Sequence, residues 1–341
     1  MNSYLLSRDC HLVKGWFRSV LQDNTRNDYD FISESLFELL EKNNLIGENE
    51  FNVEDKNWLL KNEYIFYIGE IPEEAFPEIN LSWKSPSIIT NVIIENSIIH
   101  HVNRTFELLS NMNCYHGDVL IKNKEFCLPD IKTQNFKFIK FFIPYNEKKL
   151  SGRSNELVIL YDSPLNEIRG NIIKTTKSLK KQNGASFEYF SINLKLFIES
   201  QKHHTYFNRK MYIGENGEIK NAPECDDEFG FIQDIKSESE LNDIISSTEF
   251  QKYWYVYKDI CDVCKDCEFR HMCIDNRVPH KRKKNEWYHK QECNYNPYIA
   301  KWEGEEGYNT LLECGVKSNE NEFSIDRERI VEINKELWGI S

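Results

Sequence analysis

The sequence predicts an α/β protein in three parts: a small winged-helix-like module over residues 1–80, an α/β layer or partial (βα) barrel over 81–200, and a cysteine-rich region over 201–341. Three observations lead to this prediction. The first 80 residues follow the order strand, helix, helix, strand. Short apolar runs then alternate with helical patterns, and five of the ten cysteines fall within 33 positions after position 260.

The first part begins with two short strands over 11–20, which Gly15 separates. A helical pattern with one apolar face and early acidic residues follows over 30–40. A second helix is expected over 54–62, before a strand over 63–68. A module of this kind is either a plain structural domain or a peptide-binding one, and its acidic charge argues against DNA.

The middle part opens with a continuous β-branched run over 88–94, which is typical of a strand in a buried parallel sheet. A helix is expected over 102–112. Further strands are expected over 119–121, 136–143, 157–161 and 191–198. This alternation indicates βα units, and because a complete barrel needs about 250 residues, the segment can supply only part of one.

The last part starts with a hairpin over 209–220, in which Asn216 and Gly217 form a two-residue type I′ turn. A helix is expected over 238–253, capped near Ser237 and Ser239. The cysteine-rich segment follows.

The composition limits the class of protein. The chain is 40% hydrophobic and 29% charged, which argues against disorder, collagen and coiled coil. A net charge of −12 makes nucleic acid a poor partner, with one basic run at 281–284 as the exception. The sequence contains no apolar stretch of spanning length and no secretory signal pattern, so we expect a cytoplasmic protein that does not bind membranes.

A metal centre is the best explanation for the clustered cysteines, because the cytoplasm keeps thiols reduced. The cluster consists of Cys261, Cys264, Cys267, Cys273 and Cys293. Four sulfurs suit either tetrahedral zinc or a cubane [4Fe–4S] cluster, and spacing alone does not choose between them.

The spacing Cys264-x2-Cys267-x5-Cys273, followed after a gap by Cys293, resembles the SPASM domain of radical S-adenosylmethionine peptide maturases. The resemblance implies that these four cysteines ligate one auxiliary [4Fe–4S] cluster. Cys261 is then a spare or alternative ligand. Zinc remains the alternative metal.

The sequence departs from that family in two ways, which affect the number of clusters and the chemistry that we expect. Arg277 stands where the family has a cysteine for a second cluster, and the expected Gly-x4-Cys upstream is missing, so the resemblance implies one cluster. The CxxxCxxC loop is also missing, since residues 95–101 after the first expected barrel strand contain no cysteine. The middle part therefore resembles a degenerate barrel that has lost its initiating cluster, and S-adenosylmethionine chemistry is not expected.

Segments 254–277 and 293–302 are similar to the maturases of "grasp-with-spasm" systems, as are the shorter stretches 13–19, 208–221 and 229–230. The resemblance implies a role in maturing a ribosomally synthesised peptide, with an ATP-grasp ligase and a precursor peptide as partners. The alternative is a zinc-stabilised peptide- or protein-binding scaffold without catalytic activity. A third interpretation is a redox protein that uses the single cluster for electron transfer.

The N-terminal module is the candidate peptide-binding site. Small winged-helix-like modules in peptide-modifying systems take a leader segment as an additional strand, which uses main-chain hydrogen bonds. The strand region over 13–20 is the candidate edge, and Trp16 and Phe17 are the candidate pocket residues. The simpler alternative is that both aromatic side chains belong to the core.

Overall fold

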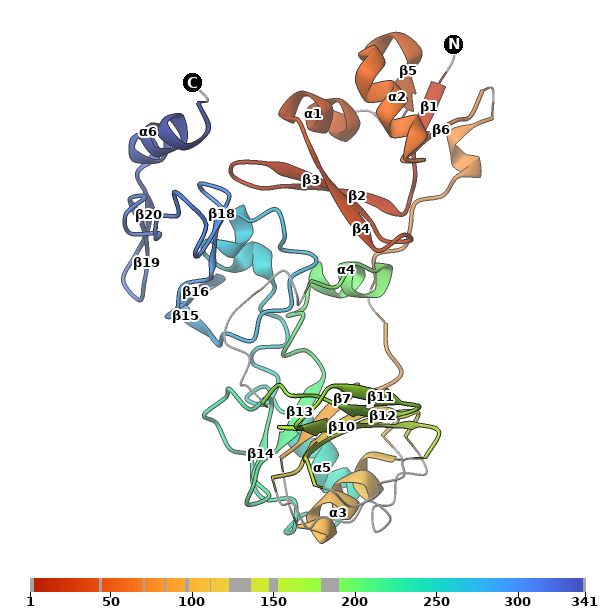
Figure 1. Ribbon diagram of the computed structural model, residues 1–341, viewed down its shortest axis with the longest axis vertical. Helices are drawn as coiled ribbons and strands as arrows, with labels where there is room; N and C mark the ends of the chain where they lie inside the picture. The colour runs from red at the N-terminus through yellow and green to blue at the C-terminus, as the bar shows by residue number, and fades with distance from the viewer. Residues whose placement is uncertain are drawn as a thin grey trace. The chain divides into compact units, whose positions relative to one another are not determined.

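The protein is a mixed α/β structure, as predicted, and its largest feature is an eight-stranded, mostly parallel sheet. The computed structural model describes residues 3–42, 45–69, 71–82, 84–95, 98–110, 112–122, 136–146, 153–178 and 190–339 (Figure 1). The chain divides into two compact units. Unit 1 comprises Met1–Trp83, Gly184–Thr205 and Val256–Ser341, and unit 2 comprises Lys84–Asn183 and Tyr206–Tyr255.

The eight-stranded sheet lies in unit 2, in the order β11-β12-β10-β9-β8-β7-β13-β14. Neighbouring strands from β12 to β13 are parallel, and the outermost strand at each end is antiparallel to its neighbour. The elements of unit 2 are β7 Asn91–Ile94, α3 Ile99–Ser110, β8 His116–Leu120, β9 Phe138–Pro144, β10 Glu156–Tyr161, β11 Glu167–Arg169, β12 Ile172–Lys174, β13 Lys210–Ile213, β14 Ile219–Lys220 and α5 Glu238–Ile245.

One face of this sheet forms the main apolar core. A row of fully buried side chains crosses five strands, because the strand register places them side by side: Ile213, Ile94, Val119, Phe141 and Val158. Both α3 and α5 pack on this core, and Figure 1 shows both helices on the same side of the sheet. The predicted parallel sheet is thus confirmed.

Three predictions in the middle and last parts were wrong in whole or in part. The helix expected over 238–253 begins at Glu238 as predicted but ends at Ile245, where the Ser246 N–H donates to the Asn242 carbonyl (2.9 Å) and closes the last turn. The segment 191–198 was expected to be a strand, but it contains the start of helix α4, Leu194–Ser200, because the Asn193 side chain accepts a hydrogen bond from the Leu196 N–H (2.9 Å) and caps the helix. The hairpin over 209–220 is confirmed, but its loop covers 214–218 instead of two residues. Gly217 adopts φ +91° in that loop and donates its N–H to the Gly214 carbonyl (3.0 Å).

The N-terminal part of unit 1 contains two three-stranded sheets, in the orders β5-β1-β6 and β2-β3-β4. Its elements are β1 Ser3–Leu6, β2 Cys10–Lys14, β3 Ser19–Asp23, β4 Asp28–Ile32, α1 Glu34–Lys42, β5 Leu45–Gly47, η1 Glu48–Glu50, α2 Val53–Lys61, β6 Ile65–Tyr67 and η2 Glu73–Ala75. The two strands around Gly15, the second helix and the last strand are confirmed. The helix expected over 30–40 begins later, because residues 28–32 pair with β3 and the Ser33 hydroxyl accepts from the Leu36 N–H (3.2 Å).

The cysteine-rich part of unit 1 consists of short elements joined by turns. They are η5 Lys258–Ile260, η6 Cys264–Asp266, β15 Pro279–Lys283, β16 Glu286–His289, β17 Tyr295–Asn296, β18 Lys301–Trp302, β19 Val316–Ser318, β20 Phe323–Ile325 and α6 Arg327–Trp338. The six strands form three two-stranded pairs. Little regular backbone structure is therefore available to hold this region together.

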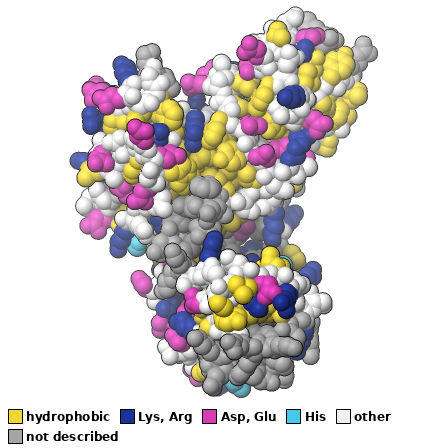
Figure 2. All heavy atoms as spheres, viewed as in Figure 1, with side chains coloured by type: hydrophobic (Ala, Val, Ile, Leu, Met, Phe, Trp, Pro, Cys, Tyr) yellow, Lys and Arg dark blue, Asp and Glu magenta, His cyan; other side chains and the backbone are white. Residues whose placement is uncertain are grey.

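Surface charge is mixed. On the face shown in Figure 2, basic and acidic side chains are interspersed among the described residues. Among the described helices, none combines the length and the apolar character needed to cross a bilayer.

Candidate metal centre

Four of the clustered cysteines meet at one cavity in unit 1. Cys264, Cys267, Cys273 and Cys293 all line it. These four cysteines lie within 30 consecutive positions of the chain. Every cysteine that the structure describes is a free thiol, and Cys127 lies outside the described residues. The sequence spacing thus brings together the four residues that it singled out as metal ligands.

The turn from Cys261 to Cys267 fixes the positions of the Cys264 and Cys267 sulfurs. Cys264 begins the short helix η6, and the N–H of Cys267 donates to the Cys264 carbonyl (3.1 Å), so the chain closes one turn between the two cysteines. Val263, just before this turn, has φ +65°. A β-branched residue rarely adopts the left-handed region, so the surrounding contacts hold the turn in a strained conformation.

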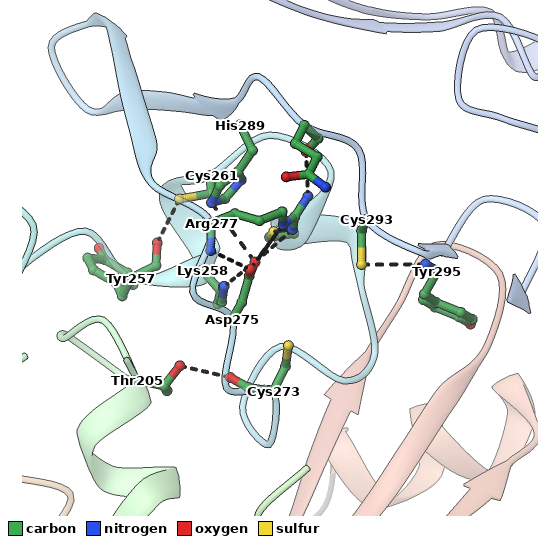
Figure 3. Close-up of polar contacts among 12 residues, drawn as sticks. Thr205, Tyr257, Lys258, Cys261, Cys273, Asp275, Arg277, His289, Cys293 and Tyr295 are labelled. Carbon is green, nitrogen blue, oxygen red and sulfur yellow. Dashed lines mark hydrogen bonds and ion pairs between the residues drawn. The ribbon is translucent and has the colours of Figure 1, made fainter. Parts of the chain in front are cut away.

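Neighbouring loops fix the positions of the Cys273 and Cys293 sulfurs. The N–H of Cys273 donates to the Phe269 carbonyl (3.0 Å), and the Thr205 hydroxyl donates to the Cys273 carbonyl (2.8 Å). Cys293 lies two residues before β17. Figure 3 shows the side chains of Cys273 and Cys293 together with the charged residues beside them.

Several N–H groups point at the sulfurs. The backbone N–H of Phe269 donates to Cys267 Sγ (3.4 Å), and that of Tyr295 donates to Cys293 Sγ (3.4 Å). Hydrogen bonds of this kind stabilise metal-bound thiolates. Burial raises the pKa of the Cys264, Cys267 and Cys273 thiols, so a metal must displace their protons to bind.

A buried charged group adjoins the cavity. Asp275 accepts hydrogen bonds from Lys258 Nζ (2.9 Å) and Arg277 Nη2 (2.7 Å), and at most 7% of any of these side chains is exposed. Arg277 also donates to the Gln291 carbonyl (2.8 Å) and lies 3.9 Å from Cys264 Sγ. Burial disfavours the Asp275 carboxylate, but the two cations outweigh it and hold its pKa well below the usual value.

A second set of possible ligands overlaps this group. One potential ligand atom each of Cys264, Asp275 and His289 lies within 4.8 Å of the others, which is close enough for one metal ion. Burial lowers the pKa of His289 and favours the neutral imidazole that binds metals. Metal binding by Asp275, however, would disrupt its hydrogen bonds to Lys258 and Arg277.

Cys261 lies outside the residues that line the cavity. Its side chain is fully buried and its thiol donates to the Tyr257 carbonyl (3.5 Å). It takes part in holding the turn next to Cys264.

The candidate peptide-binding aromatics pack on the cysteine-rich region. The rings of Trp16 and Tyr298 are 5.2 Å apart, and those of Phe17 and Trp338 are 5.6 Å apart. The N–H of Trp16 donates to the Asp266 carbonyl (2.7 Å), directly before Cys267.

A buried ionic contact joins this hairpin to the metal-binding turn. Arg18 pairs with Glu268 (2.6 Å), and both groups hydrogen-bond to the Tyr295 hydroxyl. Gly15 allows this approach, since a Cβ there would lie 2.9 Å from the Glu268 nitrogen. Burial raises the pKa of Glu268, although Tyr295 and Arg18 oppose the shift.

Sequence reasoning missed four polar residues at the site: Lys258, Glu268, Asp275 and His289. Charged residues close to clustered cysteines were the available signal, but no periodicity marks them as buried. A scan against known protein families found no match. A search of curated proteins also found no similar protein.

Proposed function

We propose that this protein takes part in maturing a ribosomally synthesised peptide, as an iron–sulfur SPASM-type protein that acts beside an ATP-grasp ligase. The observation that carries the proposal is that Cys264, Cys267, Cys273 and Cys293 line one cavity. These are the positions that match the SPASM ligand pattern, while Cys261 lies apart as the spare thiol.

The donor set fits a [4Fe–4S] cluster. Four cysteine sulfurs are available, and backbone N–H groups already point at two of them. Such a cluster supplies electron transfer or structural support, because four protein ligands leave no iron open to a substrate. The residues of this chain would bind it, exclude water from it and neutralise its charge.

The peptide is proposed to bind at the N-terminal module. The predicted edge over 13–20 divides between two strands. β2 is an edge strand of the sheet β2-β3-β4 and can accept an additional strand, whereas β3 pairs with both of its neighbours and cannot. This hairpin also contacts the metal-binding turn through Arg18 and Glu268, so peptide binding there would lie next to the proposed cluster.

Element analysis tests the metal. We expect anaerobically purified full-length protein to be brown, to absorb near ~400 nm and to contain about four irons and four sulfides per chain. A colourless protein with one zinc per chain would contradict the iron–sulfur part of the proposal.

Reconstitution tests the pathway. The full-length protein is expressed with an ATP-grasp ligase and the short peptide encoded beside its gene, and the peptide mass is measured. We expect the mass change to require this protein and to be lost in the Cys267→Ala variant. An unchanged mass in the complete system, or an identical modification without this protein, would contradict the proposal.

A zinc-stabilised binding scaffold is the second candidate, and the Cys264–Asp275–His289 geometry favours it. Substitutions identify the ligand set, and element analysis distinguishes iron from zinc in a four-cysteine centre. A mixed zinc site loses its metal in His289→Ala and keeps it in Cys273→Ala, whereas a four-cysteine centre shows the opposite pattern.

A further inference from the structure

The charges around the cysteine cavity do not balance. Asp275 is one carboxylate that faces two cations, Lys258 and Arg277, and all three side chains are almost completely buried. Other cations of this region pair with carboxylates outside this group: Arg18 with Glu268, Arg270 with Asp259, and Lys265 and Arg282 with Asp262 and Glu286. The three residues Lys258, Asp275 and Arg277, which we call the charge triad, therefore carry one excess positive charge.

An excess buried charge is unfavourable unless an opposite charge lies beside it. The triad lines the same cavity as the four cysteines, and Arg277 Nη2 lies 3.9 Å from Cys264 Sγ. Backbone groups satisfy part of the Arg277 hydrogen bonding but supply no net charge. The missing negative charge must come from whatever the cysteines hold.

We propose that the charge triad is a built-in counter-charge that makes this cavity specific for a doubly negative tetrathiolate centre and raises the reduction potential of that centre. Four thiolates around a [4Fe–4S]²⁺ core, or around Zn²⁺, carry a net charge of −2. A zinc ion held by the Cys264 thiolate, the Asp275 carboxylate and the neutral His289 imidazole carries no net charge. Because it takes Asp275 from the triad, it would leave both cations, Lys258 and Arg277, uncompensated. The proposal rests on the metal centre proposed above. The charge match applies to either metal, whereas the effect on the reduction potential applies only to the iron–sulfur cluster, because Zn²⁺ has no redox chemistry.

The sign of the redox effect follows from the charges. One-electron reduction takes the centre from −2 to −3, with the electron supplied by an external reductant and no bond formed or broken. A nearby buried cation stabilises the more negative state. Loss of one cation should thus lower the reduction potential.

Four variants test the role of the charge triad: two that remove a charge, one control outside the triad and one that keeps the charge. Arg277→Gln removes the cation that contacts sulfur, and Lys258→Met removes the cation that contacts only Asp275. Arg282→Gln is the control, because Arg282 is equally buried but already balanced by Asp262 and Glu286. Arg277→Lys keeps the charge and alters only the geometry.

We expect the equilibrium constant for reduction of the reconstituted cluster to fall about tenfold in Arg277→Gln and in Lys258→Met, which is about 59 mV for one electron. The metal-free proteins, titrated with Zn²⁺ against a chelator, should show a matching loss of affinity of about tenfold. Arg282→Gln and Arg277→Lys should stay close to the wild type in both measurements.

Three outcomes overturn the proposal. The first is that the reduction potential and the zinc affinity are unchanged in both charge-removing variants. The second is that Arg282→Gln changes them as much as the charge-removing variants do. The third is that the centre is lost completely in Arg277→Lys as well as in Arg277→Gln. If the purified protein holds only zinc, the iron–sulfur function fails, and the chelator titration still tests the charge triad on its own.

Discussion

The eight-stranded sheet of unit 2 and the cysteine-rich region of unit 1 are built in different ways. The sheet is held by regular ladders and by an apolar row that includes Ile94, Val119 and Phe141. The cysteine-rich region has only two-stranded pairs, and its interior contains ions such as Lys258 and Asp275. Apolar burial stabilises many sequences of the right pattern, whereas buried ions and thiols require specific partners.

Because of this difference, we expect the sheet and the cysteine-rich region to respond differently to substitutions. A core substitution in the sheet should cost stability in proportion to the cavity that it leaves. A substitution at a metal ligand should remove the whole contribution of the bound centre, because metal-binding energy is folding energy in such regions.

Cys267→Ala is expected to have the largest effect. It should remove the metal and expose the amides of residues 258–302 to hydrogen exchange, since structural metal sites contribute about 10–16 kcal/mol in small peptides. Amides of the unit 2 sheet should stay protected. Cys225→Ala is the matched control, because Cys225 is a buried cysteine that belongs to unit 2. Retention of full metal content in Cys267→Ala would remove the basis of the comparison.

Phe141→Ala tests the other side of the comparison. Phe141 is fully buried in the central strand β9, so we expect the free energy of unfolding to fall by about 3–5 kcal/mol in denaturant titrations. The metal content should not change. Phe138→Ala on the same strand is the control, because that side chain is 38% exposed and should matter much less. Loss of metal in Phe141→Ala would show that the two regions are not independent.

Arg18→Gln sharpens the comparison within unit 1. It leaves the fully buried Glu268 without its counter-charge, and we expect a loss of about 2–3 kcal/mol in the free energy of unfolding, because Arg18 itself is partly exposed. The metal should also dissociate faster into a chelator. Arg26→Gln, which breaks the ion pairs of Arg26 with Asp23 and Glu63, serves as the control, because none of these three described residues contacts the metal-binding turn. Equal dissociation rates in the two variants would argue against coupling between the hairpin and the metal-binding turn.

The effect of pH is the smallest near neutral pH, because it develops only below about pH 6.5. Burial, opposed by Asp9, lowers the pKa of His11 to about 4, whereas an unfolded chain has a value near 6.5. The unfolded state therefore binds a proton that the folded state does not bind, and stability should fall as the pH drops from about 6.5 to about 4, by up to about 1.4 kcal/mol per pH unit. His11→Phe should flatten this dependence and keep the stacking on Phe197. Identical pH profiles in urea titrations would contradict the prediction.

Much of the sheet could be predicted from the sequence because apolar periodicity reports burial directly. The run over 88–94 predicted a buried strand, and β7 Asn91–Ile94 lies in the middle of the sheet. The failure at 191–198 has a local cause. Its apolar residues fit a strand, but Asn193 stabilises a helix start through one side-chain hydrogen bond, which apolar spacing does not report.

The candidate site also contains some residues that the sequence predicted and others that it did not. Cysteine spacing predicted which four thiols would meet, since a CxxC turn brings two sulfurs to one side. It did not predict that Lys258 and Asp275 would be buried beside them, because charged residues are ordinarily placed at the surface. Their pairing depends on contacts between segments that no local pattern connects.

The contact between Arg18 and Glu268 has a consequence for synthesis. The two residues are 250 positions apart in the chain. At about 5–20 residues per second, the N-terminal hairpin leaves the ribosome roughly 12–50 s before its partner is made. Val13 and Val20, which are fully buried against Phe269 and Met272 in the finished protein, lack that cover throughout this interval. The nascent chain thus presents an apolar hairpin that chaperones can bind until Glu268 is made, whereas both segments of unit 2, residues 84–183 and 206–255, are complete before that point.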